Sequence, residues 1–444
     1  MSRSGSIGMS AGAYVLVTGA SGTLGRPLVA TLAAMPSVDG VVALTHVEPF
    51  FSTGSSVHVV AGDITKNAHL GLAPDAIEAV SNRVTTIIHA AANTRFDAPL
   101  WEARAANVGG TRNVLEFARR CPRLDRIVAL STTHVAGRRT GIIFEEDLDH
   151  DAGFVNSYEA SKYEAERELR AAMCELPIAV ARISTVAGDS CTGAISKKRA
   201  IHQAVRFMYA SLAPMVPGRE DSPADFIAVD HAFRAIGFLA TDGFEAGATW
   251  HICAGADTVP LGELLDLTMA TFLEHRPSWR KRAIERPALA DLPTFELFCK
   301  SVDQAGESTL RAATTAIAHF APQLAFPKWF DDRRCREAMA RAGIVPSPSR
   351  AVWSRMVKYL MQPKPADLES RILNHVNTQL LASGVGVIDA ETYLFDEGLI
   401  DSLKILQLIA FIETEIGRTI PDTEVVMSNF RNVRTMAARF GPRA

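Results

Sequence analysis

Short apolar runs alternate with amphipathic stretches along about the first 260 residues of the chain. The runs that predict strands end in small or polar residues and lie at 14–17, 40–44, 58–61, 85–89, 127–130 and 179–184. Amphipathic stretches follow several of them, and the clearest, NVGGTRNVLEFARR, begins at Asn107. Strands that alternate with helices predict a parallel sheet with helices on both faces. We therefore expect an α/β, Rossmann-like fold built on a doubly wound parallel sheet.

The first predicted strand runs directly into a glycine-rich turn. Residues 18–35, TGASGTLGRPLVATLAAM, place three glycines at GxxGxxG spacing between this strand and an amphipathic helix. A strand, a tight turn and a helix N-terminus in this order can receive a pyrophosphate, although the commonest dinucleotide fingerprint is GxGxxG. The residues that we expect to contact a dinucleotide here are Gly19, Gly22, Thr23, Leu24 and Gly25.

The end of the second predicted strand bears on the choice of dinucleotide. An NAD enzyme usually places an acid there to bind the ribose hydroxyls. This strand instead ends in Thr45 and His46, with Glu48 two residues further on. Arg26, directly after the third glycine, can meet a 2′-phosphate. The pattern favours NADPH, and NADH stays open as the alternative because Glu48 is near.

Tyr158 and Lys162 stand four residues apart in FVNSYEASKYEAE, a stretch whose composition favours a helix. Helical spacing places the two side chains on one face, about one turn apart. A tyrosine hydroxyl titrates near ~10, and an adjacent ammonium group stabilises its phenolate. The pair can therefore protonate an oxyanion as hydride reaches a carbonyl carbon. The same spacing is common on solvated helices, so the assignment depends on the motifs around it.

Seven motifs follow one another in the order TGASGTLG, GDI, HAAA, NVGGT, LSTTHVAG, YEASK and VARISTVAG. Over about residues 13–260 this series resembles an extended short-chain dehydrogenase/reductase. The resemblance implies that Thr132, Tyr158 and Lys162 are catalytic, with Ser131 and Thr133 as alternatives to Thr132. The cofactor contacts that it implies are Asp63, Ile64, Ala90, Ala91, Asn107, Tyr158 and Lys162. For Asn107 a purely structural role is equally open, and Arg182 is either an ion-pair partner or a substrate ligand.

Stretches beyond this core extend the resemblance. GDSCTGAISKKRAIHQAVRFMY and DFIAVDHAFRAIGFLA resemble the fatty acyl reductase and thioester reductase branch, as does HFAPQLAFPKWFDDRRCREAMARAGI. The implied reaction is NADPH-dependent reduction of an acyl thioester to an aldehyde or further to an alcohol. The same residues would serve a ketone on a carrier-bound chain. A nucleotide-sugar epimerase or dehydratase is disfavoured, because no acid stands directly at the end of the second strand.

A second unit is predicted from Asp367 onward. DLESRILNHVNTQLL carries apolar Leu368, Ile372, Val376 and Leu380 at three-to-four spacing, which predicts an amphipathic helix. LFDEGLIDSLKILQLIAFIETEIG then resembles an acyl or peptidyl carrier protein, in which the DSL serine, Ser402, receives 4′-phosphopantetheine. A serine there can also be a simple helix N-cap. The resemblance implies an all-α four-helix carrier domain that meets a phosphopantetheinyl transferase and an acyl-loading enzyme or synthase.

The charge of this second unit suits docking on basic partners. Residues 367–425 contain eleven acids and three bases, a net charge of −8. Basic clusters on the preceding part of the chain are Lys197, Lys198 and Arg199; Arg276, Arg280, Lys281 and Arg282; and Arg333, Arg334 and Arg336. A non-enzymatic alternative makes the chain an acyl donor with a docking scaffold, but a scaffold has no need of the Thr132, Tyr158 and Lys162 set.

Composition limits the remaining possibilities. The 444 residues exceed one compact core, and a net charge of −3 with 48% hydrophobic residues gives no sign of nucleic-acid binding. Six scattered cysteines form no CxxC or Cys/His cluster, which predicts no metal site and a cytoplasmic location. No apolar run reaches the ~18 residues of a membrane span.

These patterns predict four segments. A disordered leader at 1–12 precedes the dehydrogenase/reductase at 13–362, whose dinucleotide-binding core lies at about 13–260 and whose smaller substrate-binding region lies at about 184–362. A proline-containing linker at 363–366 precedes the carrier domain at 367–440, and we expect AVWSRMVKYLM to close the reductase. So short a linker favours service of the carrier in trans, within a homodimer or to a partner enzyme.

Overall fold

The structure is a computed structural model of the chain. It describes residues 13–46, 56–197, 199–275, 286–305, 308–361, 368–381, 388–395, 398–400, 402–416 and 419–441. The chain divides into two compact units, Met1–Met361 and Gln362–Ala444, which we name the N-terminal and C-terminal units. The expected leader at 1–12 and the expected linker at 363–366 lie outside the described residues.

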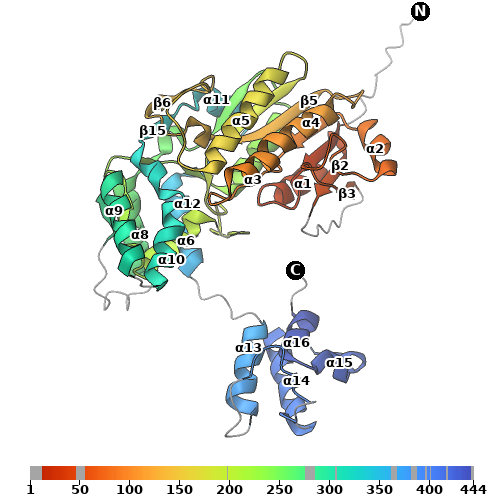
Figure 1. The fold of residues 1–444 in the computed structure, drawn as a ribbon. Helices are drawn as coiled ribbons and strands as arrows, with labels where there is room; N and C mark the ends of the chain where they lie inside the picture. Colours follow the sequence, from red (N-terminus) through yellow and green to blue (C-terminus); the bar gives the residue numbers. More distant parts are fainter. Residues whose placement is uncertain are drawn as a thin grey trace, which may run out of the picture. The chain divides into compact units, whose positions relative to one another are not determined.

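Seven parallel strands form the central sheet of the N-terminal unit (Figure 1). They are β1 (Ala13–Thr18), β2 (Val38–Thr45), β3 (Val57–Ala61), β4 (Thr86–His89), β5 (Arg126–Thr132), β7 (Ile178–Ile183) and β12 (Thr249–Ile252). The spatial order is β12-β7-β5-β4-β1-β2-β3, so the chain reverses its direction of growth between β1 and β4. Doubly wound sheets bind ligands at the carboxyl ends of the strands beside such a reversal. The predicted doubly wound parallel sheet is confirmed.

The sequence pattern missed β12 and ended β5 too early. β12 is only four residues long, TWHI, and His251 interrupts its apolar character. The last residues of β5 still pair with β7, Ser131 with Arg182 and Thr132 with Ile183. This register carries two hydroxyl side chains to the carboxyl edge of the sheet.

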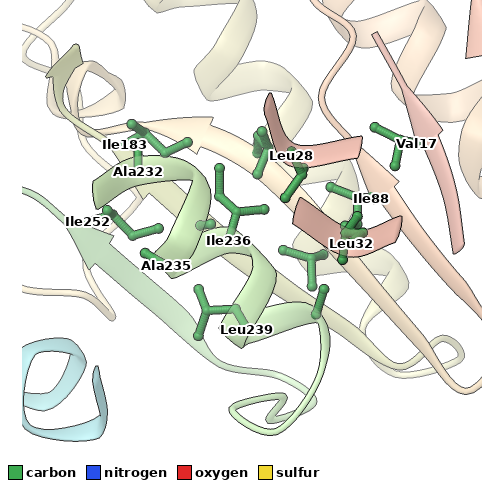
Figure 2. Packing of buried hydrophobic residues seen from close by; sticks show 14 of the residues in the cluster. Val17, Leu28, Leu32, Ile88, Ile183, Ala232, Ala235, Ile236, Leu239 and Ile252 are labelled. Atoms are coloured by element: carbon green, nitrogen blue, oxygen red, sulfur yellow. The ribbon is translucent and has the colours of Figure 1, made fainter. Parts of the chain in front are cut away.

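Helices cover both faces of the sheet. Because strand side chains alternate, Val15 and Val17 of β1 pack on one face and Leu16 on the other. The helices α1 (Gly25–Ala33), α7 (Val229–Ala240) and α11 (Arg333–Arg341) pack on the first face. Figure 2 shows Leu28 and Leu32 of α1 beside Ile236 of α7 in this layer. The opposite face is packed by α2 (Pro74–Ser81), α4 (Gly110–Ala118) and α5 (Ser157–Ala172).

A second hydrophobic cluster builds the smaller region of the N-terminal unit. Its helices are α6 (Ala200–Tyr209), α8 (Leu261–His275), α9 (Leu292–Ala305), α10 (Ser308–Ala318) and α12 (Ser349–Met361). In α12 the residues Trp353, Met356 and Val357 are buried, and the Trp353 indole donates to the Thr268 hydroxyl at 2.8 Å. AVWSRMVKYLM therefore packs within this region of the N-terminal unit.

Short strand pairs and single turns connect these layers. The strand pairs are β6 (Gly141–Ile143) with β15 (Lys328–Phe330), β8 (Thr185–Val186) with β11 (Phe226–Ile227), β9 (Met215–Pro217) with β14 (Ala288–Ala290), and β10 (Pro223–Ala224) with β13 (Val259–Pro260). The short helical segments are α3 (Leu100–Arg104), the π-helix η1 (Ala105–Gly109), and the 3₁₀ turns η2 (Thr133–Ala136), η3 (Gly255–Asp257) and η5 (Ala321–Ala325).

The C-terminal unit is helical in its described residues and has its own hydrophobic cluster. Its elements are α13 (Leu368–His375), the π-helix η6 (Val376–Leu380), α14 (Ser402–Ile416), η7 (Asp422–Glu424), α15 (Met427–Phe430) and α16 (Val433–Phe440). The four apolar residues that the sequence placed on one helix face, Leu368, Ile372, Val376 and Leu380, are all buried. Among the described helices of the whole chain, none has the length and apolar character that a membrane crossing requires.

Candidate active site

The glycine turn after β1 has the shape of an anion cradle. Gly19 has a φ of +69°, and the Gly22 amide donates to the Gly19 carbonyl at 2.9 Å. A Cβ at Gly25 would lie 2.2 Å from that carbonyl oxygen, and a Cβ at Gly19 would lie 2.7 Å from the Ala91 nitrogen. The helix α1 begins at Gly25 with neither a side-chain cap nor an acid in its first turn. Its amides and dipole therefore fit the pyrophosphate of a dinucleotide.

The loop after β4 is held against this turn by one hydroxyl group. The Thr18 hydroxyl accepts hydrogen bonds from the amides of Ala90 and Ala91, both at 3.1 Å. His89 bridges the Thr18 hydroxyl at 2.9 Å and the Thr111 hydroxyl at 3.1 Å. Burial lowers the pKa of His89 to about 3, so a neutral imidazole fixes this loop.

Asp63 and Ile64, two of the expected cofactor contacts, follow β3. The Asp63 carboxylate accepts the Thr65 amide at 2.9 Å and the Thr65 hydroxyl at 2.7 Å. Burial acts to raise the pKa of Asp63, and the Thr65 hydrogen bonds outweigh it and lower that pKa. His46, directly after β2, lies 3.3 Å from the same carboxylate. Ile64 is buried beneath the sheet edge.

Two groups bear on the choice between NADPH and NADH. Arg26 is an exposed side chain in the first turn of α1, directly after the glycine turn. Glu48, the acid that kept NADH open, lies outside the described residues. The described end of β2 therefore offers the His46 imidazole, already paired with Asp63.

The start of α5 is set by its capping residues. The Asn156 side chain accepts the Glu159 amide at 3.0 Å, and the Glu159 carboxylate accepts the Val155 amide at 2.9 Å. Such reciprocal capping satisfies amides that the helix leaves unpaired. The helix therefore begins at Ser157, and Tyr158 lies in its first turn.

Tyr158 meets Thr132 at the carboxyl edge of the sheet. The Thr132 hydroxyl interacts with the Tyr158 phenol and acts to lower its pKa, and it also accepts the His134 amide at 3.3 Å. The Phe96 ring packs against the Tyr158 ring with centroids 5.4 Å apart. Burial raises the pKa of Tyr158, against the opposing effects of the Thr132 hydrogen bond and the Arg199 charge. The phenol therefore keeps its proton at neutral pH and is available to donate it.

Lys162 lies one turn further along α5 and is buried. Its ammonium donates to the Leu130 carbonyl of β5 at 2.8 Å. Burial lowers the pKa of Lys162 to about 8, against the opposing charge of Glu166. Tyr158, Lys162 and Thr132 are therefore gathered around the end of β5.

A buried ion pair lies behind these residues. Arg182 of β7 donates to Glu166 of α5 at 2.6 Å, and both side chains are almost completely buried. The Ser131 hydroxyl donates to the same Glu166 carboxylate at 2.6 Å. Of the two roles left open for Arg182, the structure shows the ion pair.

This arrangement also separates the three neighbouring hydroxyls of the LSTTHVAG motif. Ser131 is engaged by Glu166, and the buried Thr133 hydroxyl has no hydrogen-bond partner among the described residues. Thr132 is the hydroxyl that meets Tyr158. Sequence reasoning missed Glu166, although its position four residues after Lys162 places it on the same helix face.

Asn107 braces the same helix from the opposite side. It lies in η1, where its amide oxygen accepts the Asn93 amide at 2.8 Å. Its amide nitrogen donates to the Asn93 carbonyl at 3.0 Å and to the Ser161 hydroxyl at 2.9 Å. Asn107 thus ties the loop after β4 to the residue preceding Lys162, which is the geometry of a structural brace.

Of the basic clusters that the sequence offered as docking sites, the one at 333–336 is committed to ion pairs within the unit. Arg333 pairs with Asp331 at 2.6 Å, Arg334 with Glu245 at 2.5 Å and Arg336 with Asp332 at 2.7 Å. Lys198 and the cluster at 276–282 lie outside the described residues. Ser402 begins α14 of the C-terminal unit, and its neighbour Asp401 is outside the described residues. Among the described side chains, no group of three or more His, Cys, Asp or Glu could hold a metal ion.

The doubly wound sheet, the glycine cradle beside its reversal point and the Thr132, Tyr158 and Lys162 arrangement define an NAD(P)-binding oxidoreductase of the extended short-chain dehydrogenase/reductase class. Residues 17–236 match the model of the family described as Male sterility protein.

Curated relatives match shorter stretches of the chain. A stretch of 144 residues is 33% identical to glycine betaine reductase ATRR of Emericella nidulans, covering 31% of this chain and 11% of that protein. A stretch of 87 residues is 36% identical to chloroplastic fatty acyl-CoA reductase 2 of Arabidopsis thaliana, covering 20% of this chain and 14% of that protein. A stretch of 71 residues is 35% identical to "Probable acyl carrier protein PigG" of Serratia sp., covering 16% of this chain and 82% of that protein.

A solved structure shares the fold. The terminal R domain from the myxalamid PKS-NRPS biosynthetic pathway aligns with a TM-score of 0.65 at 23% identity, over 79% of this chain and 91% of that chain. At this identity the likeness concerns the fold. The chain spans only 7–14% of the length of the first curated relatives.

Proposed function

We propose that this chain reduces an acyl group, held as a thioester on phosphopantetheine, to an aldehyde, with NADPH as the hydride donor. The observation that carries the proposal is the grouping of Thr132, Tyr158 and the buried Lys162 at the end of β5, where the Lys162 ammonium donates to the Leu130 carbonyl at 2.8 Å. A second reduction of the aldehyde to the alcohol would use the same residues.

The residues of the chain have separate tasks in this reaction. The hydroxyls of Thr132 and Tyr158 hydrogen-bond the thioester oxygen, and Tyr158 gives that oxygen its proton as the new carbon–hydrogen bond forms. The Lys162 ammonium stabilises the phenolate that remains. The resulting hemithioacetal then breaks its carbon–sulfur bond, which yields the aldehyde and a free thiol. A nicotinamide dinucleotide, held by the glycine cradle and by Asp63, Ala90 and Ala91, would supply the hydride.

Three observations support the choice of substrate and cofactor. An acyl-CoA is a thioester of phosphopantetheine, and a reductase of fatty acyl-CoA is among the relatives. A further relative is named as a carrier protein, and Ser402 begins a helix of the C-terminal unit within the carrier-like DSL tripeptide. Arg26 follows the glycine turn, where a 2′-phosphate would need a cation.

Intact-mass measurement tests the proposal directly. The full chain is first loaded by a phosphopantetheinyl transferase and an acyl-CoA, and NADPH is then added. We expect the acyl mass to disappear from the protein, leaving phosphopantetheine with a free thiol on the chain. The aldehyde is then detected as its dinitrophenylhydrazone after the reaction has been quenched. Tyr158→Phe is the matched control and should keep its acyl group.

The same measurement separates the alternatives. A chain that keeps its acyl group and gains two hydrogens would be a ketone reductase. A chain that keeps its acyl group unchanged with every acyl tested, while it still binds NADPH, would contradict both reactions. If Ser402→Ala still gains phosphopantetheine, Ser402 is not the attachment site. That result would leave the proposed reduction itself untouched.

A further inference from the structure

Arg199 begins the helix α6 and is held in place by a buried histidine. The Arg199 amide donates to His202 Nδ1 at 2.9 Å, and His202 Nε2 lies 2.9 Å from the Ala187 carbonyl. Burial lowers the pKa of His202, so the ring is neutral and accepts at one nitrogen while it donates at the other. The backbone of Arg199 is thereby fixed relative to the chain that leaves β8.

The Arg199 side chain reaches back to the dinucleotide-binding half of the unit. One guanidinium nitrogen donates to the Thr23 hydroxyl at 3.1 Å, and another donates to the Thr94 hydroxyl at 3.0 Å. Thr23 belongs to the glycine cradle, and Thr94 belongs to the loop that Thr18 and His89 hold beside the cradle. The Arg199 guanidinium therefore contacts two loops at once. Thr94 lies 105 residues before Arg199 in the sequence, and Thr23 lies 176 residues before it.

The partners of this guanidinium are unusual for the chain. Among the described residues no carboxylate lies within ion-pair distance of Arg199, whereas Arg333, Arg334 and Arg336 each have one. A guanidinium between neutral hydroxyls at the mouth of an anion cradle keeps its charge available for a ligand. Arginine presents parallel donors that match two oxygens of a phosphate group.

We propose that Arg199 binds the pyrophosphate of the dinucleotide cofactor and so closes the glycine cradle from the side of the substrate-binding region. The proposal rests only on the dinucleotide-binding part of the proposed function, and it stands whichever carbonyl compound is reduced. Thr23 and Thr94 position the guanidinium before the cofactor arrives. When bound, the cofactor thereby links the start of α6 to the glycine turn.

The electrostatics of Tyr158 place Arg199 near the reacting groups. The positive charge of Arg199 acts to lower the pKa of the Tyr158 phenol, so its influence extends from the cradle to the proton donor. An arginine in that position lies where a dinucleotide runs from its pyrophosphate toward its nicotinamide. Of the basic cluster KKR at 197–199, Arg199 is thus directed into the site.

Equilibrium binding of four ligands tests this assignment. The probes are NADPH, NADH, ADP-ribose, which keeps the pyrophosphate, and adenosine 2′-monophosphate, which lacks it. Arg199→Gln should weaken NADPH, NADH and ADP-ribose alike, by about 10- to 100-fold, because it removes a charge-assisted contact with the phosphate. Binding of adenosine 2′-monophosphate should stay unchanged.

Two further variants serve as matched controls. Arg206→Gln removes an exposed arginine from the same helix and should leave all four affinities unchanged. Arg26→Ala should weaken NADPH and adenosine 2′-monophosphate and spare NADH and ADP-ribose, so the Arg26 and Arg199 variants share only the loss of NADPH affinity. Arg199→Lys keeps a charge without the fork and should give intermediate affinities, and it carries the test if Arg199→Gln does not fold.

Several outcomes would overturn the assignment. NADH binding equal to that of the wild type in folded Arg199→Gln, or in Arg199→Lys where only that variant folds, would exclude a pyrophosphate contact. A loss confined to NADPH and adenosine 2′-monophosphate would move Arg199 to the 2′-phosphate. Normal cofactor affinities with no thioester reduction in the wild type would contradict the proposed reaction and leave the binding test of Arg199 intact.

Discussion

Opposing interactions set the pKa of the Tyr158 phenol. Burial raises the pKa of the phenol, whereas the Thr132 hydrogen bond and the Arg199 charge act to lower it. Because burial prevails, the group is a protonated phenol at neutral pH, as an acid that donates to an oxyanion must be. In the proposed reaction the Lys162 ammonium, one helical turn away, would stabilise the phenolate that remains.

Tyr158→Phe tests the role of this proton. The variant keeps the aromatic packing against Phe96 and loses only the hydroxyl. We expect the rate of acyl reduction to fall by ~10²-fold or more, with the NADPH dissociation constant near the wild-type value. Single-turnover kinetics and a binding titration on the same preparation check both. Undiminished turnover in a variant that binds NADPH would remove Tyr158 from the mechanism.

At this scale the sequence predicted residues better than it predicted their partners. The order of the motifs identified Thr132, Tyr158 and Lys162 as candidates. The structure places all three around the end of β5. The sequence named Thr132 and kept Ser131 and Thr133 as alternatives, because the position of each hydroxyl depends on where the strand ends and on Glu166 of another element. The contact of Arg199 with Thr23 spans 176 residues, and no local pattern encodes such a distance.

At the scale of elements, the edge of the sheet depends on one buried carboxyl group. Glu145 follows β6 and accepts the backbone amide of His251 in β12 at 2.8 Å. Burial raises the pKa of Glu145 to about 7, although the hydrogen bond from His251 acts to lower it. The short strand β12, which the sequence pattern missed, is thus fixed by a distant side chain as well as by its ladder with β7.

This carboxyl group predicts a pH dependence of stability. Its folded-state pKa of about 7 lies above its ordinary value of 4.5, so the folded protein binds the proton more tightly than the unfolded chain does. The stabilising contribution is therefore complete below pH 4.5 and is lost as the pH rises from there through about 7. Glu145→Gln keeps an oxygen for the His251 amide and removes the titration.

Urea unfolding at two pH values checks this expectation. The free energy of unfolding of Glu145→Gln should exceed that of the wild type by up to about 3 kcal/mol at pH 8, with the difference shrinking toward pH 5. Asp147→Asn is a useful comparison, because the pKa of Asp147 is lowered in the folded protein. The ionised Asp147 therefore stabilises the fold, and its removal should decrease the free energy of unfolding where removal of Glu145 increases it. A difference between Glu145→Gln and wild type that is the same at both pH values would show that Glu145 does not titrate in this range.

At the scale of the whole molecule, two units with separate hydrophobic cores share one chain. The cluster at 333–336, which the sequence offered to an acidic carrier, is already neutralised by Asp331, Glu245 and Asp332. Exposed ion pairs contribute little to stability, yet they do cancel the local charge that would attract a partner. A carrier that docks on this unit would therefore need another surface.

A mixing experiment distinguishes service within one chain from service between chains. Ser402→Ala lacks the proposed attachment site and keeps the catalytic residues, whereas Tyr158→Phe keeps Ser402 and lacks the proton donor. We expect a mixture of Ser402→Ala with acyl-loaded Tyr158→Phe to release aldehyde, because a linker as short as the one predicted at 363–366 would restrict the reach of the carrier. Release should rise with the concentration of Ser402→Ala. No release, from parents that each fold and bind NADPH or accept phosphopantetheine, would indicate service within one chain.

Because η1 is a π-helix, the position of the Asn107 side chain depends on the number of residues in this segment. A regular α-helix turns by about 100° per residue, and a π-helix accommodates one extra residue within such a helix. Deletion of Ala106 would restore a regular helix and swing the Asn107 amide by about that angle, away from Ser161 and Asn93. The shortened helix would gain regular hydrogen bonds while the loop after β4 lost its brace. When a related sequence is aligned with this chain, a one-residue gap within 105–109 therefore indicates that the related protein has lost the Asn107 hydrogen bonds to Asn93 and Ser161. A sequence without that gap is expected to keep them.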